Sequence, residues 1–491
     1  MRKLMFSALL AGGVATALEA APTDAVTQAD LQALIERITR LEAENQAQAR
    51  RIAELEGKAP VALPAAKESG AADKPAVEDE TKVSETGRVY TTKQGYQYYL
   101  ADKFAGIFEP LTESGLKLTP YGYLVMEATH NTRATDVDVY TDWVRPKHAS
   151  HLGHTTTLSV QDSILGMRLE TPEAVDGWTF SGKAEFDFAG DHANDYAFHW
   201  RHLYMEAAHE TGWKILAGQT WHLWKMVAPS EIDGAWMENT GYPYRRSPQF
   251  RVTRTFTFED ESSLELRAGL VKNGPGMGGD RDGDGTQDNS ASGWALVEGA
   301  ALYSRKAAWE EDRSWMIGIA GMYGRDKSHS ILDDGSYGSA DEYDSKMIMV
   351  AGTLPLTTGI GSFTLTGQFF AGENLGGIQA GVGQRVAYTH GFGQKGSEVA
   401  TIGGFIDLAY ELNAAWSFAL GYGFDDPNDS DAKYAEGRCF NDRVYMDAFY
   451  RINSNLKLGF EYAHLRTRYN GEEDPGTAGD DRFQFSAFYD F

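Results

Sequence analysis

The chain ends in the stretch Asp480-Asp481-Arg482-Phe483-Gln484-Phe485-Ser486-Ala487-Phe488-Tyr489-Asp490-Phe491, whose side chains alternate between apolar and polar. Neighbouring side chains of an extended chain point to opposite faces, so this alternation predicts a β-strand with one apolar and one wetted face. The apolar face would carry Phe483, Phe485, Ala487, Tyr489 and Phe491. The polar face would carry Arg482, Gln484, Ser486 and Asp490, with Phe488 as its one apolar residue. A soluble β-sandwich gives the same pattern, so the rest of the chain must decide the fold.

The same alternation recurs from residue 115 onward, most clearly in the segments 178–187, 264–270, 443–452 and 456–462. The polar face of each segment carries ionised side chains. Charged groups are costly in a packed core, whereas they suit the water-filled lumen of a barrel. The alternation therefore favours a transmembrane β-barrel over a sandwich.

The connections between the predicted strands are of two kinds. Short turns are expected at 172–177, 210–213, 259–262, 412–415 and 453–455. Long connections are expected at 130–155, 220–247, 273–292, 325–343, 372–397, 425–441 and 469–480. Outer-membrane barrels have short turns at one end and long loops at the other, and counting strands between the breaks predicts an all-β, antiparallel barrel of about 16 strands.

Composition narrows the class of protein further. The chain has 491 residues, a net charge of −25 and 12% aromatic residues. No run approaches the roughly 20 apolar residues that a membrane helix requires, so a membrane would be crossed by strands. Strong acidity argues against a nucleic-acid partner, and Cys439, the one cysteine, excludes a disulfide framework. The G-x-S-x-G and H-E-x-x-H motifs are absent, and we expect no enzymatic activity.

The amino-terminal part divides into three predicted segments before the barrel domain of residues 114–491. Residues 1–21 have a positive start, an apolar run and small residues near a cleavage site, as in a secretory signal peptide. Residues 26–57 contain heptads with Leu31, Ile38 and Ile52 at a and Leu34, Leu41 and Leu55 at d, which predicts a coiled coil and a homo-oligomer. Residues 58–113 are predicted to be a linker followed by an aromatic pre-barrel segment.

The long connection 220–247 joins the fifth and sixth predicted strands. It carries Glu231, Asp233 and Glu238 together with Trp221, Trp224 and Trp236, and it ends in Tyr242-Pro243-Tyr244-Arg245-Arg246. Apolar bulk with a few charges suits a loop packed inside a wet barrel, because its backbone polar groups need partners at membrane depth. The alternative is an ordinary surface loop, but the many aromatic residues of this segment favour a loop inside the barrel.

Two short motifs flank this loop: Gly218-Gln219-Thr220-Trp221 before it and Arg246-Ser247-Pro248-Gln249-Phe250-Arg251 after it. With the heptads and the terminal Phe491, they make the chain resemble the DcaP-type porins. The resemblance implies a trimeric channel of the bacterial outer membrane, a periplasmic coiled coil, a third loop folded into the barrel and uptake of dicarboxylates or related anions. It also implies that the barrel-assembly machinery reads Phe491. Phosphate- and sugar-selective porins share this plan, so both substrate classes stay open.

Strand parity places a set of cations on the polar, lumen-facing side: Arg168, Lys183, Arg251, Arg267, Arg443 and Arg451. Together with Arg245 and Arg246, they would face Glu231, Asp233 and Glu238 across a constriction and favour anions. The alternative is that these cations pair with wall acids such as Glu185, Glu265 and Asp447 and only stiffen the barrel. Both interpretations stay open for each residue.

The predicted loop 273–292 contains the beginning of a calcium-binding pattern. Oxygen-bearing side chains stand at alternate positions, namely Asp280, Asp282, Asp284, Thr286 and Asp288, with Gly285 at the turn. Ala291 replaces the final bidentate carboxylate, so we expect weak calcium binding or a plain acidic loop.

A passive diffusion channel for small hydrophilic solutes, with a preference for small anions, is the function that these patterns favour. Acidic surface loops could share divalent cations with lipopolysaccharide. The alternatives are a barrel that tethers the outer membrane to peptidoglycan through its coiled coil, and a barrel hydrolase.

Overall fold

The computed structural model describes residues 89–91, 97–99 and 116–491, except for 138, 147–152, 172–174, 191–196, 235, 274–294, 311–312, 332–336, 388–395 and 472–474. These residues belong to one compact unit, Val83–Phe491. The predicted signal peptide, coiled coil and calcium loop lie outside the described residues. Among the described residues, no helix is both long and apolar enough to cross a membrane.

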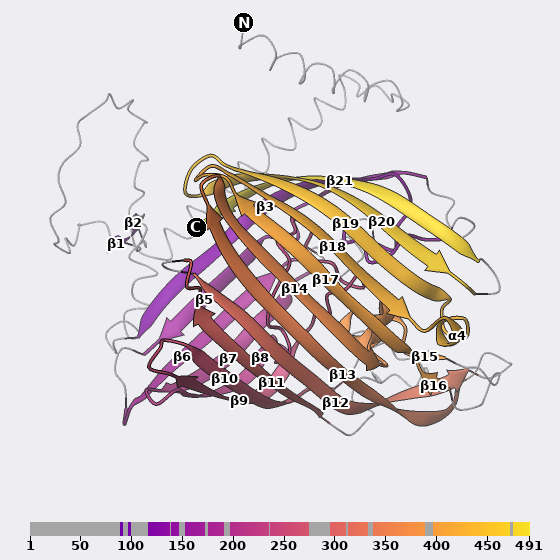
Figure 1. Cartoon of the computed structure of the whole chain (residues 1–491), viewed down its shortest axis with the longest axis horizontal. Helices are drawn as coiled ribbons and strands as arrows, with labels where there is room; N and C mark the ends of the chain where they lie inside the picture. The colour runs from indigo at the N-terminus through magenta and orange to yellow at the C-terminus, as the bar shows by residue number, and fades with distance from the viewer. Residues whose placement is uncertain are drawn as a thin grey trace, which may run out of the picture. The chain divides into compact units, whose positions relative to one another are not determined.

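Antiparallel strands close into a barrel whose strands are strongly tilted (Figure 1). They are β3 (Lys117–Asn131), β4 (Thr155–Ser159), β5 (Ile164–Glu170), β6 (Trp178–Asp187), β7 (His199–His209), β8 (Trp213–Trp221), β9 (Arg246–Thr257), β10 (Ser263–Val271), β11 (Leu296–Lys306), β12 (Ser314–Ile331), β13 (Tyr337–Thr358), β14 (Gly361–Glu373), β17 (Ala400–Glu411), β18 (Trp416–Pro427), β19 (Arg438–Arg451), β20 (Leu456–Tyr469) and β21 (Gly476–Asp490). Because β4 and β5 pair with successive parts of β3, the barrel has 16 strands, which confirms the prediction.

The quoted carboxy-terminal stretch closes the barrel as β21. Its residues pair with β3 from Arg482 opposite Asn131 to Asp490 opposite Tyr123. Phe491 continues the pairing through two backbone hydrogen bonds with Gly122, with N···O distances of 3.1 and 3.2 Å. A Cβ on Gly122 would lie 3.0 Å from the Phe491 ring, so the missing side chain leaves room for that ring.

The two faces of the barrel wall differ as predicted. On β21, Arg482, Gln484 and Ser486 are at most 2% exposed, whereas Phe483 and Phe485 are at least 40% exposed. The polar face therefore lies inside and the apolar face outside, the reverse of a soluble protein. Near the short turns, a row of aromatic rings runs around the outer face with centroid separations of 4.5 to 6.2 Å: Phe363, Tyr410, Phe418, Trp416 and Tyr450. Such girdles mark the membrane interface in barrels.

The two ends of the barrel are called the turn end and the loop end here. All five predicted short turns connect strands at the turn end. Two predicted long loops were wrong, because β12 and β13 pair as far as Ile331 opposite Tyr337, and β20 and β21 as far as Tyr469 opposite Gly476. These segments carry charged side chains on both faces, and such a sequence is typical of a loop. In the structure, side chains of opposite charge pair across neighbouring strands. Arg325 thus lies 3.3 Å from Asp344.

Candidate permeation pathway

Residues 222–245, between the fifth and sixth barrel strands, fold into the barrel and are called the inserted loop. Their back packs against the inner wall formed by β17 to β20, where Met237 and Tyr242 are fully buried. The wall accommodates this approach at Gly423, where a Cβ would lie 2.1 Å from the carbonyl oxygen of Thr240. An apolar back against the wall leaves the front of the loop facing the lumen.

Charged residues fix the tip of the inserted loop to the wall. Arg443 of β19 lies 2.6 Å from Glu231 and 2.7 Å from Asp233, both on the loop, and 3.0 Å from Glu461 of β20. Arg482 of β21 contacts Asp233 at 3.2 Å. All five side chains are buried and form what we call the ion-pair cluster. The three carboxylates are close enough to bind a metal ion, but the two guanidinium groups already neutralise much of their charge.

The first residues of the inserted loop are also held. His222 lies 2.5 Å from Glu298 of β11, which also accepts a hydrogen bond from the backbone N–H of Leu223 at 2.9 Å. Arg267 of β10 donates to the carbonyl oxygens of Leu223 and Lys225 at 3.1 and 3.3 Å. The loop is therefore anchored to opposite sides of the barrel.

A second segment, residues 374–387 between β14 and β17, also enters the lumen and is called the companion loop. It contains the 3-10 turns η2 (Gly376–Ile378) and η3 (Gly381–Gly383) and the short strand β15 (Val386–Ala387), which pairs with β16 (Ser397–Glu398). The N–H of Tyr244 donates to the carbonyl of Ile378 at 3.0 Å, and that of Asn239 to Gln379 at 3.1 Å. A long connection at this position was predicted from the sequence, but its entry into the barrel was not.

A cavity of about 1040 Å³ lies between the front of the inserted loop and the opposite wall. At the loop end it begins at Asp136 and Arg145, in the connection after β3. At the turn end it reaches Lys457 and Asp490. β3, β6 and β7 form its far wall, so the cavity extends along the barrel and is the candidate pathway.

Arg246 lines one side of this cavity together with the aromatic rings of Trp236 and Tyr244. The guanidinium of Arg246 stacks 3.9 Å from the ring centroid of Trp221 and 5.1 Å from that of Tyr244. Lys225 lies 3.4 Å above Trp221 and 4.8 Å from Trp236, and burial lowers its pKa to about 6. Ring faces attract cations, so these contacts hold the Arg246 guanidinium beside the pathway, whereas the lowered pKa of Lys225 leaves that amine mostly neutral at pH 7.

Arg201 of β7 also lines the cavity, and it was not among the residues predicted to face the lumen. A β-bulge at this point places both Arg201 and His202 opposite Glu185. Arg201 then lies 2.9 Å from Glu185 and 2.6 Å from Asp187. Without the bulge, strict alternation would put Arg201 on the outer face, the same face as Leu203. The extra residue of the bulge reverses the alternation, and Arg201 therefore points inward.

Acidic side chains of the cavity are held by neighbouring groups. Asp136 accepts hydrogen bonds from the N–H groups of Asp142 and Trp143 at 3.0 and 3.2 Å, and burial raises its pKa to about 7. Asp162 accepts a hydrogen bond from Tyr140. On the inserted loop, burial raises the pKa of Glu238 to about 8, although a hydrogen bond from Gln379 opposes this change.

The ten predicted constriction residues occupy three kinds of position. Glu238, Arg245 and Arg246 line the cavity, as does Glu231, whose carboxylate is paired with Arg443. Asp233 and Arg443, expected to face each other across open space, are in direct contact. The remaining four lie on the lumen-side wall, outside the cavity lining: Arg168, Lys183, Arg251 and Arg267.

Wall acids hold two of these four cations, as the alternative interpretation expected. Lys183 lies 2.9 Å from Glu185, and Arg267 lies 2.6 Å from Glu265. Arg168 instead stacks 4.8 Å from the ring of Tyr121. Charged residues of the inserted loop and of β7 therefore line the pathway where these four cations do not.

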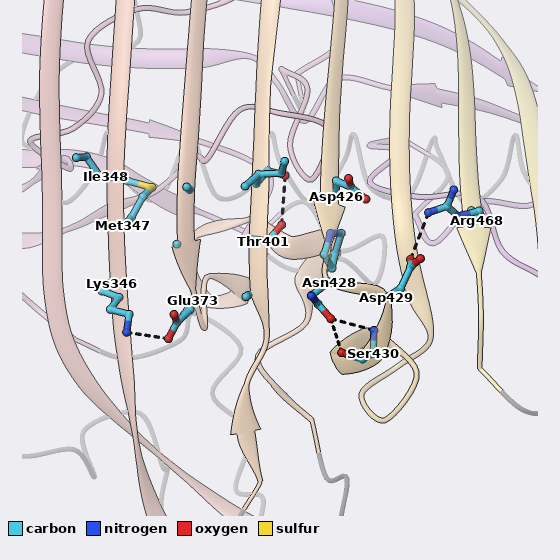
Figure 2. A pocket seen from close by; sticks show the side chains of 15 residues that line it. Lys346, Met347, Ile348, Glu373, Thr401, Asp426, Asn428, Asp429, Ser430 and Arg468 are labelled. Atoms are coloured by element: carbon cyan, nitrogen blue, oxygen red, sulfur yellow. Dashed lines mark hydrogen bonds and ion pairs between the residues drawn. The ribbon is translucent and has the colours of Figure 1, made fainter.

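Another cavity of about 1040 Å³ lies on the outer face near the loop end (Figure 2). Lys346 and Arg468 point into it together with exposed Ile348 and Ile402, which share the outer face of the wall. The cations are paired, Lys346 with Glu373 at 2.9 Å and Arg468 with Asp429 at 3.3 Å. This cavity is separated from the lumen by the barrel wall.

Solved structures share this architecture. The outer membrane channel DcaP of Acinetobacter baumannii is 18% identical, with a TM-score of 0.58, over 77% of this chain and 97% of that one. The chain has a porin fold. OprB of Pseudomonas putida is 10% identical, with a TM-score of 0.50, over 80% of this chain and 98% of the other. No protein-family model and no curated protein sequence matches the chain.

Proposed function

We propose that the protein is an outer-membrane porin through which small hydrophilic solutes diffuse, with a preference for small anions such as dicarboxylates. Arg245 and Arg246 carry the anion preference. Both line the cavity, and among the described residues neither has a carboxylate within ion-pairing distance. A cation that is not neutralised by the wall is available to a passing anion.

Three acids that line the same cavity near the inserted loop are less available to cations. Asp187 is paired with Arg201, Glu231 with Arg443, and the raised pKa of Glu238 leaves that carboxyl mostly neutral at pH 7. The local balance at the inserted loop therefore differs from the net charge of −25. Charges elsewhere act weakly there, because salt screens them within about 8 Å at physiological ionic strength.

This function implies an orientation and an assembly. The turn end would face the periplasm and the loop end the cell exterior, with residues 1–21 removed on export. Residues 26–57 would form a periplasmic coiled coil that supports a homotrimer, and residues 58–113 would connect it to the barrel. The heptad pattern and the resemblance to DcaP-type porins support this arrangement.

Uptake into liposomes that contain the purified full-length protein tests the proposal. Radiolabelled succinate should enter at least as fast as erythritol, an uncharged solute with the same number of carbons. Liposomes without protein provide the baseline. Entry of neither solute would exclude a channel, and several-fold faster entry of erythritol would exclude an anion preference.

A further inference from the structure

Arg451 of β19 and Lys457 of β20 are direct cross-strand partners on the lumen side of the wall. Like charges directly opposite each other in an antiparallel pair are destabilising. Among the described residues, no carboxylate lies within ion-pairing distance of either side chain. The comparable pair Arg168 and Lys183 differs, because Lys183 contacts Glu185 at 2.9 Å.

These two cations line a pocket of about 180 Å³ at the turn end. Its other polar side chains are Asn413, Ser417 and Glu411, the one carboxylate among the lining residues. The pocket is larger than the roughly 150 Å³ cavity that accommodates benzene in an engineered protein, so a small organic anion fits it.

Aromatic rings position Lys457 between this pocket and the pathway. Its ammonium lies 4.9 Å from the ring centroid of Phe449 and 4.6 Å from that of Phe488, the apolar exception on the polar face of the last strand. Lys457 and Phe449 line both the pocket and the main cavity. A ligand in the pocket is therefore beside the route of a permeating solute.

From this geometry we infer that Arg451 and Lys457 form an anion-binding subsite at the turn end, which takes a small oxyanion such as a carboxylate or phosphate. This inference rests on the proposed function, because the subsite would be the last position at which a permeating anion binds before its release from the channel. Channels conduct best when sites in series bind weakly enough to release the solute. Arg245 and Arg246 would be the earlier site.

Calorimetric titration of the purified full-length protein in detergent tests this subsite. The background is Arg245→Gln with Arg246→Gln, so that the earlier site contributes no heat. Succinate and inorganic phosphate are the two probes, and the one with higher affinity identifies the ligand chemistry. Adding Arg451→Gln, or separately Lys457→Gln, should lower that affinity about tenfold or more, because each removes a charged contact. Lys457→Arg should retain most of it.

Lys214→Gln is the matched control, because it removes a cation near the same end without altering the pocket lining. It should leave the affinity within about twofold, since exposed charges are screened. Folding of each variant is checked by its gel shift on heating. Absence of heat with both probes, unchanged affinity in both Gln variants, or an equal loss in Lys214→Gln would overturn the subsite. None of these results depends on conduction, so a failure of the proposed function would be recognised separately.

Discussion

At the scale of single residues, Arg443 has the largest expected effect on stability. It is surrounded by the buried carboxylates of Glu231, Asp233 and Glu461. Arg443→Leu should lower the free energy of unfolding by about 3–5 kcal/mol, because it leaves buried charges without a partner. The release of the inserted loop should also raise single-channel conductance.

Urea unfolding and bilayer recording measure these two effects. Arg466→Leu is the control, because its side chain is half exposed and its pair with Asp442 should contribute about 1 kcal/mol or less. Equal stability of the two variants would mean that the ion-pair cluster does not anchor the loop.

Glu238 gives a pH prediction. Burial raises its pKa to about 8, so this carboxyl is neutral at pH 6 and negative at pH 9. Rising pH adds a negative charge beside Arg245 and Arg246, and the anion-to-cation permeability ratio should therefore fall. Reversal potentials at the two pH values measure the ratio. In the Glu238→Gln variant, the ratio should fall less between the two pH values. An equal fall in this variant would show that other groups cause the pH dependence.

Alternation in the sequence predicted which residues of most strands face the lumen, because burial of one face imposes period two. It missed Arg201, since a one-residue bulge reverses parity without a sequence signal. It also missed the contact between Arg443 and Glu231, which are far apart in the chain. Such contacts form only when the barrel closes and the loop enters it, so the alternation of neighbouring residues in the sequence does not predict them.

At the scale of elements, β21 closes the barrel, and Phe491 completes its pairing with β3. Deleting Phe491 should reduce the amount of folded protein in the membrane while leaving the conductance of each channel unchanged, because its ring packs over the outer face of Gly122. Heat-modifiability on gels measures folded protein. Normal assembly of the shortened chain would contradict this role.

The two inward loops differ in how much of their course the sequence indicates. The position of the inserted loop between the fifth and sixth strands was predicted, and its aromatic residues indicated burial. The inward course of the companion loop was not predicted, because residues 374–387 are rich in glycine and contain no aromatic side chain. Their burial depends on backbone hydrogen bonds to the inserted loop, such as that from Tyr244 to Ile378.

At the scale of the whole molecule, an acidic chain forms a barrel whose narrowed lumen presents two arginines that have no ion-pair partner among the described residues. The two inward loops place Arg245 and Arg246 beside the pathway, while the ion-pair cluster neutralises much of the nearby acidity. Selectivity should therefore follow these few side chains and not the total charge. Calcium binding by residues 280–288 stays a prediction from the sequence.

The reversal potential in a potassium chloride gradient tests this account most directly. Three proteins are compared in planar bilayers: the unmodified chain, Arg245→Gln with Arg246→Gln, and the control Arg305→Gln with Lys306→Gln. The control removes two adjacent cations that form exposed ion pairs near the turn end. The account predicts anion selectivity in the unmodified and control channels, and a shift toward cations in the Arg245 and Arg246 variant. Strong cation selectivity in all three, without a shift, would contradict it.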